Sequence, residues 1–283
     1  MKLIIGTAQI GMRYGVAGGG DFDQRKVDDL LKLAVSHNIN SIDTAPGYGD
    51  AHLKIGKSAV KNLNIITKLP KLNLKTNQKK KIKNDVKNYL TTLNCRKLYC
   101  LLLHNPKDFL SSNGNSIYLA LNLLKEEGLI EKFGVSTYEL EDLNSIVDNF
   151  KIDIVQHPVN ILDRRLEKSG TLKKLNIQGI EVHCRSVFLQ GLLLLNLERI
   201  NSKFYPFRKD LLKIHNFSMK SQKTIQEICL SYVLNIKNIS KIIVGIDDKK
   251  QLKELIKIIE NKEVINIPEF KISNKNILDP RTW

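Results

Sequence analysis

Short apolar runs recur along the chain and alternate with longer segments that carry apolar residues at helical spacing. The runs are rich in Leu, Ile and Val, and their apolar residues are continuous rather than alternating with polar ones. A strand that is buried on both faces of a parallel sheet has this pattern. The pattern therefore predicts eight buried strands, at residues 3–5, 41–43, 64–68, 98–103, 132–135, 154–156, 179–184 and 241–244.

The segments between these runs predict helices. In the first of them Val27, Leu30, Leu31 and Ala34 are spaced so that they share one helix face. Comparable amphipathic stretches cover residues 51–60, 82–93, 117–124, 140–150, 166–175, 224–236 and 252–259. Parallel strands need such crossover helices, and eight strand–helix units in a chain of 283 residues fit a closed (β/α)8 TIM barrel. We expect residues 1–283 to form a single barrel domain.

A doubly wound open sheet is the alternative architecture. It would place a Gly-x-Gly-x-x-Gly motif directly after the first strand, and no such motif follows residue 5. The Gly18-Gly19-Gly20 run comes later and lacks that spacing, so we interpret it as a flexible turn.

The strand–helix rhythm breaks between residues 190 and 221. This long connection follows the seventh strand, on the side of a barrel where active sites are built. We expect it to cover a cofactor or substrate. The carboxyl-terminal tail is expected to pack over the same rim, with a frayed end at Trp283 as the alternative.

The chain is strongly basic, with a formal net charge of +16. Nucleic-acid binding is one interpretation, but the basic residues are mostly Lys scattered over polar helix faces, without interleaved aromatics. We therefore expect no nucleic-acid partner. No apolar run is long enough for a membrane span or a signal peptide, and the four cysteines show no metal-binding spacing. We expect a cytoplasmic protein that binds no metal and does not contact a membrane.

Four polar residues lie at or just beyond the carboxyl ends of the second, third and fourth strands: Asp43, Tyr48, Lys68 and His104. In a barrel these ends converge on one rim. A Tyr hydroxyl can protonate a carbonyl oxygen, but a phenol with a pKa near 10 is a weak acid at neutral pH. A nearby ammonium stabilises the phenolate, a carboxylate can hold that ammonium, and an imidazole can polarise the carbonyl oxygen. The four side chains therefore predict a site for proton transfer to or from a carbonyl.

The order of these residues resembles that of the aldo-keto reductases. Asp43-Thr44-Ala45-x-x-Tyr48-Gly49 is similar to the family's signature around its catalytic Asp and Tyr, and the strand ends at Lys68 and His104 resemble the next two motifs. Matching segments follow at residues 134–136 and 155–163, so the resemblance runs from residue 5 to about residue 255. It implies hydride exchange with a nicotinamide cofactor, with Tyr48 as general acid or base, Lys68 and Asp43 tuning it, and His104 orienting the substrate oxygen.

The resemblance also implies a set of cofactor-binding residues. Gly6 and Thr7 would line the cofactor rim beside Asp43, and Ser136 and Gln156 would bond the nicotinamide carboxamide. The other implied contacts are Arg185, Ser186, Phe188, Gly191, Gly245, Ile246, Asp247, Gln251 and Glu254.

Several positions depart from the family pattern, and four of them bear on the cofactor. Thr137 stands where the family often has Asn, and Arg185 stands where an aromatic usually stacks on nicotinamide; a guanidinium plane can also stack on a ring. Beyond the eighth strand, Asp247 and Asp248 would repel the 2′-phosphate of NADP and could instead bond a ribose diol. NADP is the cofactor implied by default, and NAD stays an alternative.

The expected substrate is a small polar carbonyl compound or sugar. The candidate pocket loops are residues 9–14, 105–109, 162–165 and 202–208. Their four arginines, Arg13, Arg164, Arg165 and Arg208, suit a polar or anionic substrate, although each also fits a surface salt bridge. Two alternatives remain: a sugar 1-dehydrogenase working in the oxidative direction, and a catalytically slow cofactor-binding regulatory subunit of the same fold. We expect a monomer or a weak homo-oligomer.

Overall fold

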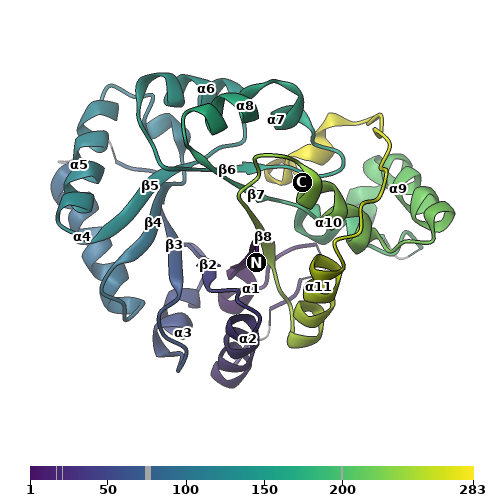
Figure 1. Cartoon of the computed structure of the whole chain (residues 1–283), viewed down its shortest axis with the longest axis horizontal. Coiled ribbons are helices and arrows are strands. Elements are labelled where there is room, and N and C mark those ends of the chain that lie inside the picture. The colour runs from purple at the N-terminus through teal and green to yellow at the C-terminus, as the bar shows by residue number, and fades with distance from the viewer. Residues whose placement is uncertain (17, 21, 74–77, 199) are drawn as a thin grey trace.

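Each predicted apolar run forms a strand in the computed structural model, which describes residues 1–16, 18–20, 22–73, 78–198 and 200–283. The strands are β1 (Leu3–Gly6), β2 (Ser41–Asp43), β3 (Asn64–Leu69), β4 (Leu98–Leu103), β5 (Ile130–Ser136), β6 (Ile154–Pro158), β7 (Glu181–Arg185) and β8 (Lys241–Gly245). They pair in sequence order, and β8 pairs with β1 in parallel to close the ring. The prediction of a (β/α)8 TIM barrel is confirmed (Figure 1).

The inward-facing side chains form layers, because side chains two residues apart on a strand share a face. Ile66 and Ile154 belong to a buried apolar cluster that also contains Ile4, Cys100, Leu102 and Ile243. Two residues further along the same strands come Lys68 and Gln156, both buried. The barrel interior is therefore apolar in its middle layer and polar at the carboxyl end of the strands.

Helices surround the barrel, and their apolar faces pack against the outer faces of the strands (Figure 1). They are α2 (Gln24–Ser36), α3 (Ala51–Lys57), α4 (Gln78–Thr92), α5 (Gly114–Glu126), α6 (Leu140–Asn149), α7 (Arg165–Lys168), α8 (Thr171–Ile177), α10 (Ile225–Asn235) and α11 (Lys249–Asn261). The helix predicted over 166–175 is divided into α7 and α8. Gly170 lies between them with φ of 78°, a left-handed conformation that interrupts an α-helix.

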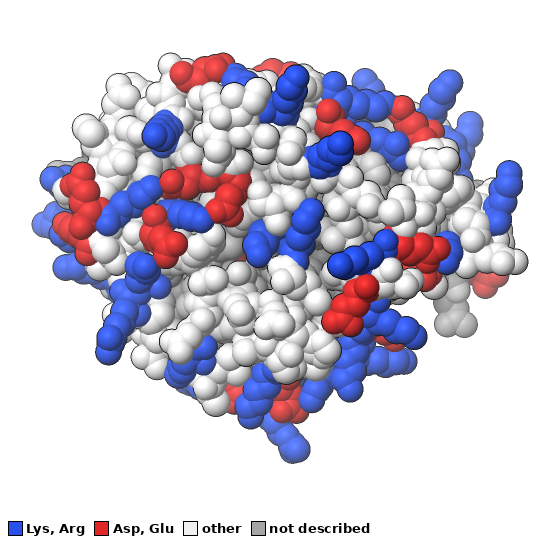
Figure 2. Space-filling view, viewed as in Figure 1, with Lys and Arg blue, Asp and Glu red and all other residues white. Residues whose placement is uncertain are grey.

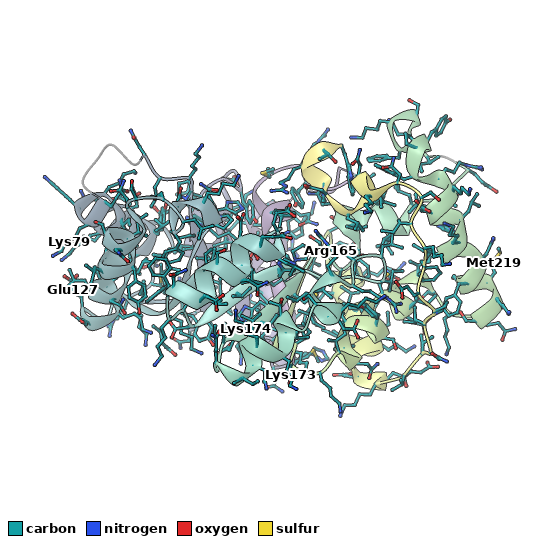
Figure 3. The ribbon with its side chains drawn as sticks, turned by 90° about the horizontal axis from the view of Figure 1, so that it is seen from above. Lys79, Glu127, Arg165, Lys173, Lys174 and Met219 are labelled. Carbon is teal, nitrogen blue, oxygen red and sulfur yellow. The ribbon has the colours of Figure 1, made fainter. Side chains whose placement is uncertain are left out.

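The connection after β7 contains more regular structure than the sequence pattern predicts. It includes 3-10 segments η2 (Leu189–Leu194) and η3 (Ser202–Phe207), followed by helix α9 (Arg208–Ser221). In Figure 1 α9 stands outside the ring of helices, and Figure 3 shows Met219, which is 71% exposed, at its outer end. Further short turns are α1 (Ala8–Gly11), η1 (Pro106–Asp108), η4 (Lys275–Leu278) and η5 (Pro280–Thr282).

The carboxyl-terminal tail packs on this connection. The ring of Trp283 lies 5.7 Å from that of Phe204 and 5.9 Å from that of Phe207, measured between centroids. Its indole N–H donates a hydrogen bond to the carbonyl of Asn276 at 2.8 Å. Trp283 is therefore held against η3 rather than frayed.

On the face seen in Figure 2, Lys and Arg side chains are spread around the periphery, and acidic side chains lie among many of them. Within the described part of the chain, no helix is long and apolar enough to cross a membrane.

Candidate active site

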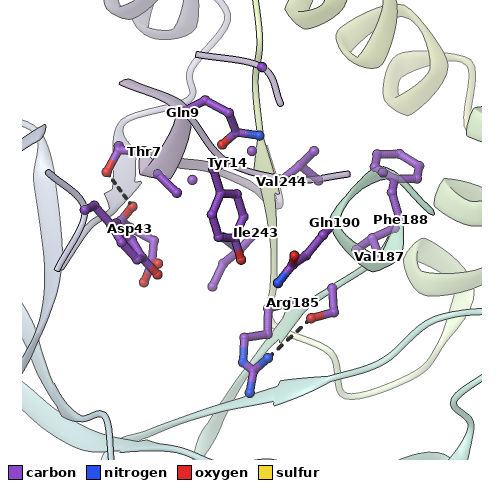
Figure 4. Close-up of a pocket in the computed structure, with 18 of the residues that line it drawn as sticks. Thr7, Gln9, Tyr14, Asp43, Arg185, Val187, Phe188, Gln190, Ile243 and Val244 are labelled. Carbon is purple, nitrogen blue, oxygen red and sulfur yellow. Dashed lines mark hydrogen bonds between the residues drawn. The ribbon is translucent and has the colours of Figure 1, made fainter. Parts of the chain in front are cut away.

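A pocket with a cavity volume of about 320 Å³ opens at the carboxyl ends of the strands. It brings together all four residues of the predicted proton-transfer site: Asp43, Tyr48, Lys68 and His104. Most of the residues implied for cofactor binding also line it, namely Gly6, Thr7, Ser136, Gln156, Arg185, Ser186, Phe188, Gly191, Gly245, Asp247 and Gln251 (Figure 4). Two do not: Ile246 is fully buried in the core, and Glu254 is exposed on α11.

Lys68 and Asp43 form a buried ion pair at the base of the pocket. The Lys68 ammonium lies 2.5 Å from Asp43 Oδ1 and also donates to the carbonyl of Thr44 at 3.0 Å. Burial opposes the charged ammonium, but the negative charge of Asp43 and the nearby Tyr48 outweigh it and hold the pKa of Lys68 above its ordinary value. Lys68 is therefore a fixed positive charge at neutral pH.

Tyr48 lies beside this ammonium. The loop that follows β2 turns back at Ala45, whose carbonyl accepts a hydrogen bond from the Tyr48 backbone N–H at 3.0 Å. The Lys68 ammonium is 5.3 Å from the centroid of the Tyr48 ring. The phenol and the ammonium thus share one corner of the pocket.

His104 directly follows β4 and faces the same pocket. Desolvation, followed by the positive charges of Lys68 and Arg185, lowers the pKa of His104 to about 4. Its imidazole is therefore neutral at neutral pH and can act as a hydrogen-bond donor to an oxygen without carrying a charge.

Gln156 has one satisfied and one unsatisfied polar atom. Its Nε2 donates to Asp43 Oδ2 at 2.5 Å, which completes the contacts of that carboxylate. Its Oε1 is buried and has no hydrogen-bond partner among the residues that the structure describes, although Gln156 lines the pocket. A buried acceptor of this kind fits a ligand N–H group, and the NH2 of a nicotinamide carboxamide is such a donor.

Thr137, at the position where Asn was noted as usual, does not line the pocket. It is fully buried, and its hydroxyl contacts His157 Nδ1 at 2.8 Å. Its carbonyl accepts a hydrogen bond from Arg185 at 2.9 Å. Thr137 therefore supports Arg185 instead of facing a ligand.

The floor between β1 and β8 is formed by two glycines. A Cβ on Gly6 would lie 3.1 Å from the backbone nitrogen of Gly245, and a Cβ on Gly245 would lie 2.5 Å from the side chain of Gln9. Glycine at these positions therefore allows β1 to approach β8 and Gln9 to pack over Gly245.

The far end of the pocket carries carboxylates at the start of α11. Asp248 accepts the backbone N–H of Gln251 at 2.7 Å, and the Gln251 side-chain oxygen accepts the backbone N–H of Asp247 at 2.7 Å. Burial raises the pKa of Asp247 above its ordinary value. Of the backbone N–H groups that an anion could bind here, those of Asp247 and Gln251 are therefore already bonded to the chain's own side chains.

A strap formed by residues 14–16 and 18–20 crosses the mouth of the pocket. Tyr14 pairs with Gly19, and the backbone N–H of Val16 donates to the carbonyl of Gln190 at 2.8 Å. A Cβ on Gly19 would lie only 2.1 Å from Asp247 Oδ1, so a larger residue there would require the Asp247 side chain to move. Of the glycine run interpreted as a flexible turn, Gly19 thus belongs to the pocket wall.

Sequence reasoning missed several wall residues. Tyr14 is drawn between Asp43 and Arg185 in Figure 4, and burial raises its pKa to about 12. Tyr138 and Gln190 also line the pocket. Tyr14 lay in a loop expected to form the pocket, whereas the only signal for Tyr138 was its place two residues after Ser136.

The loops expected to hold substrate divide into two groups. Residues 9 and 14 contribute to the pocket, whereas none of residues 105–109 or 202–208 lines it. Arg164 and Arg165 lie in a neighbouring groove, and their guanidinium groups bind the carbonyl of Pro268 and the carboxylate of Asp163, respectively. Neither arginine is therefore available in the pocket itself.

Comparisons with known proteins agree with this geometry. The model of the aldo/keto reductase family matches residues 2–273. An NADH-specific methylglyoxal reductase of Escherichia coli is 25% identical over 89% of this chain and 88% of its own length. Among solved structures, the holo form of an aldo-keto reductase from Bacillus halodurans is similar with a TM-score of 0.75 at 21% identity, covering 92% of this chain and 86% of that one. A glycerol dehydrogenase from Gluconobacter oxydans is similar with a TM-score of 0.69 at 18% identity, covering 96% and 95%.

Proposed function

The chain belongs to the aldo/keto reductase family, whose members are NAD(P)H-dependent oxidoreductases, and on that premise we propose that it is an NADH-dependent reductase of small polar carbonyl compounds. Tyr48 is the proposed general acid. The observation that carries this proposal is the buried Lys68–Asp43 pair, which fixes a positive charge beside the Tyr48 ring inside the pocket.

The pocket residues have separable roles in this proposal. A bound dihydronicotinamide would supply the hydride. Tyr48 donates its phenolic proton to the substrate oxygen, and the Lys68 ammonium stabilises the phenolate that remains. His104, neutral at neutral pH, donates an N–H to the same oxygen and orients it. In the oxidative direction Tyr48 acts as the base.

The cofactor contacts are proposed from the pocket lining. Gln156 Oε1 is the acceptor for the carboxamide NH2, and Ser136 lies on the neighbouring strand. Gly6, Thr7 and Gly245 form the floor, and Arg185 is the group available to stack on the nicotinamide ring. Ile246 and Glu254 are left out of this set because their side chains lie outside the pocket.

NADH is proposed over NADPH because of Asp247 and Asp248. A 2′-phosphate at the start of α11 would meet the carboxylate of Asp247 in the pocket lining and that of Asp248 at the N-cap of the helix. Of the backbone N–H groups there, those of Asp247 and Gln251 are already bonded to side chains of the chain. A ribose diol, in contrast, can donate its hydroxyl protons to a carboxylate. The similar Escherichia coli protein is named as NADH-specific, which agrees with this choice.

The proposal is tested by following NADH absorbance with a panel of methylglyoxal, glyceraldehyde and an aldose. The wild-type protein should oxidise NADH with at least one of them, and Lys68→Met should lose about 100-fold or more in kcat/KM. A wild type no faster than Lys68→Met on every substrate, with NADH still bound, would contradict the enzyme and favour the regulatory subunit.

A further inference from the structure

Arg185 differs from the other cations in and around the pocket. It ends β7 and lines the cavity, yet within the described residues no carboxylate lies within ion-pair distance of its guanidinium. Lys68, by comparison, is bound to Asp43, and Arg165 is bound to Asp163. Arg185 therefore brings to the pocket wall a positive charge that no described residue holds in an ion pair, although it acts at a distance on Asp279, whose pKa is lowered by Arg281 and, more weakly, by Arg185.

The guanidinium of Arg185 is held by neutral groups. One terminal nitrogen donates to the carbonyl of Thr137 at 2.9 Å and the other to the Ser186 hydroxyl at 3.3 Å. Its Cζ lies 3.9 Å from the centroid of the Tyr138 ring. The plane of the guanidinium is thus fixed before any ligand binds.

Tyr138 is itself clamped by a second arginine. Cζ of Arg281, from the carboxyl-terminal tail, lies 3.8 Å from the same ring centroid. Two guanidinium carbons this close to one centroid fit only on opposite faces of the ring. Arg281 forms ion pairs with the carboxylates of Asp279 and Glu139. Arg185, in contrast, forms no ion pair with any described residue.

Arg185 keeps hydrogen-bonding capacity for a ligand. A guanidinium has five N–H bonds, and the two acceptors named above leave three of them. Its Nε is buried and has no acceptor within the described part of the chain. Planar donors on a cation without an ion-pair partner there suit the oxygens of a carboxylate or a phosphate, which accept two N–H bonds at once.

We propose that Arg185 binds an oxyanion, a carboxylate or a phosphate, carried by the same small molecule as the reacting carbonyl. This inference rests on the proposed function and narrows its substrate class to anionic aldehydes and ketones. The charge of Asp43 is offset by the Lys68 ammonium with which it is paired, so Asp43 does not offset the charge of Arg185. Stacking of nicotinamide on Arg185 is compatible with it, because a ring would use a guanidinium face and the oxyanion its edge.

Matched substrate pairs test the inference. The carboxylate pair is succinic semialdehyde and butanal, and the phosphate pair is glyceraldehyde 3-phosphate and glyceraldehyde. For each pair we define the anion preference as kcat/KM for the charged member divided by kcat/KM for the neutral one. Arg185→Gln should lower the anion preference of at least one pair by about 30-fold or more. Arg185→Lys keeps the charge and loses the planar donors, so its anion preference should lie between those of the wild type and Arg185→Gln. An Arg185→Gln protein with an unchanged anion preference for both pairs would overturn the inference.

Two controls separate the remaining explanations. Arg96→Gln removes an exposed arginine that precedes β4, at the opposite end of the strands, and should leave the anion preference within about twofold. The pyrophosphate of the cofactor is the other oxyanion that Arg185 could bind. If Arg185→Gln instead weakens NADH binding about 30-fold and leaves the anion preference unchanged, Arg185 is a cofactor residue and the inference is wrong.

A binding measurement covers the case in which the wild type reduces nothing. Succinate and glycerol 3-phosphate, which carry the anion without a carbonyl, are titrated calorimetrically into wild type and Arg185→Gln saturated with NAD. Binding of either probe that weakens at least tenfold in Arg185→Gln supports the anion site even if the proposed reductase activity fails. No binding to the wild type, or equal binding to both proteins, contradicts the site.

Discussion

The ammonium of Lys68 lies 2.5 Å from Oδ1 of Asp43, and only 2% and 6% of the two side chains are exposed to solvent. A buried pair of this kind is costly to desolvate and contributes little net stability compared with apolar residues of the same shape. Its presence at the end of the barrel strands therefore indicates selection for function. The pair also makes a sharp stability prediction, because neither charge is tolerated there alone.

Asp43→Asn is predicted to lower the free energy of unfolding by about 3 kcal/mol, because it leaves a buried ammonium without a counter-charge. Urea denaturation at neutral pH measures this. The matched control is Glu127→Gln, which breaks the Lys83–Glu127 pair at the edge labelled in Figure 3. Those side chains are 35% and 31% exposed, so the control should cost less than about 1 kcal/mol. An equal loss of unfolding free energy in the two variants would mean that the buried Lys68 ammonium does not depend on Asp43 as its counter-charge.

Asp247 is predicted to set the choice of cofactor. The wild type should favour NADH in kcat/KM, and Asp247→Ser should raise NADPH use relative to NADH by about 10-fold, because it removes a carboxylate of the pocket lining that would repel the 2′-phosphate in the proposed binding mode. Glu260→Gln, at the far end of α11 and paired with His37, is the control and should not change the ratio. A wild type that already favours NADPH would refute the repulsion argument.

His157 is predicted to make stability depend on pH. Burial, with repulsion from Arg185 and Arg165, lowers its pKa from 6.5 to about 3. Between these two values the unfolded chain binds a proton that the folded chain excludes, so the free energy of unfolding falls as the pH drops through this window. From about pH 7 to about pH 5 this residue should account for a loss of about 1–2 kcal/mol.

His157→Asn removes that titration and should flatten the dependence of urea-denaturation stability on pH across the window. His37→Asn is the control, because that side chain is 38% exposed. If the two variants show the same slope as the wild type, His157 is not the group responsible.

The barrel was predictable because its signal is repeated. Strands buried on both faces must be continuous apolar runs, and eight of them leave little architectural choice. Helix α9 was missed because its fully buried apolar residues are few, Leu211 and Ile214, so its apolar stripe is weak. The break at Gly170 was missed because a residue's positive φ is a consequence of packing as much as of its type.

The polar side chains at the strand ends of the candidate site were predictable from the sequence, but the loop contacts in the pocket wall were not. Asp43, Lys68 and His104 sit at strand ends, and parallel strand ends must converge on one rim. The strap through Tyr14 and Gly19 depends on where a loop crosses, which no local pattern encodes. The stack of Arg185 and Arg281 on Tyr138 could not be predicted either, because these residues lie far apart in the sequence, with Tyr138 and Arg281 separated by 143 positions.

The central element of the proposed mechanism is Tyr48 as the proton donor next to Lys68. The direct test is the single-turnover rate of NADH oxidation by Tyr48→Phe, with the best substrate of the wild type and with NADH affinity measured separately. We predict a rate lower by about 10²- to 10⁴-fold, with the dissociation constant of NADH changed by less than about threefold. A Tyr48→Phe protein that transfers hydride within about threefold of the wild-type rate would contradict the account.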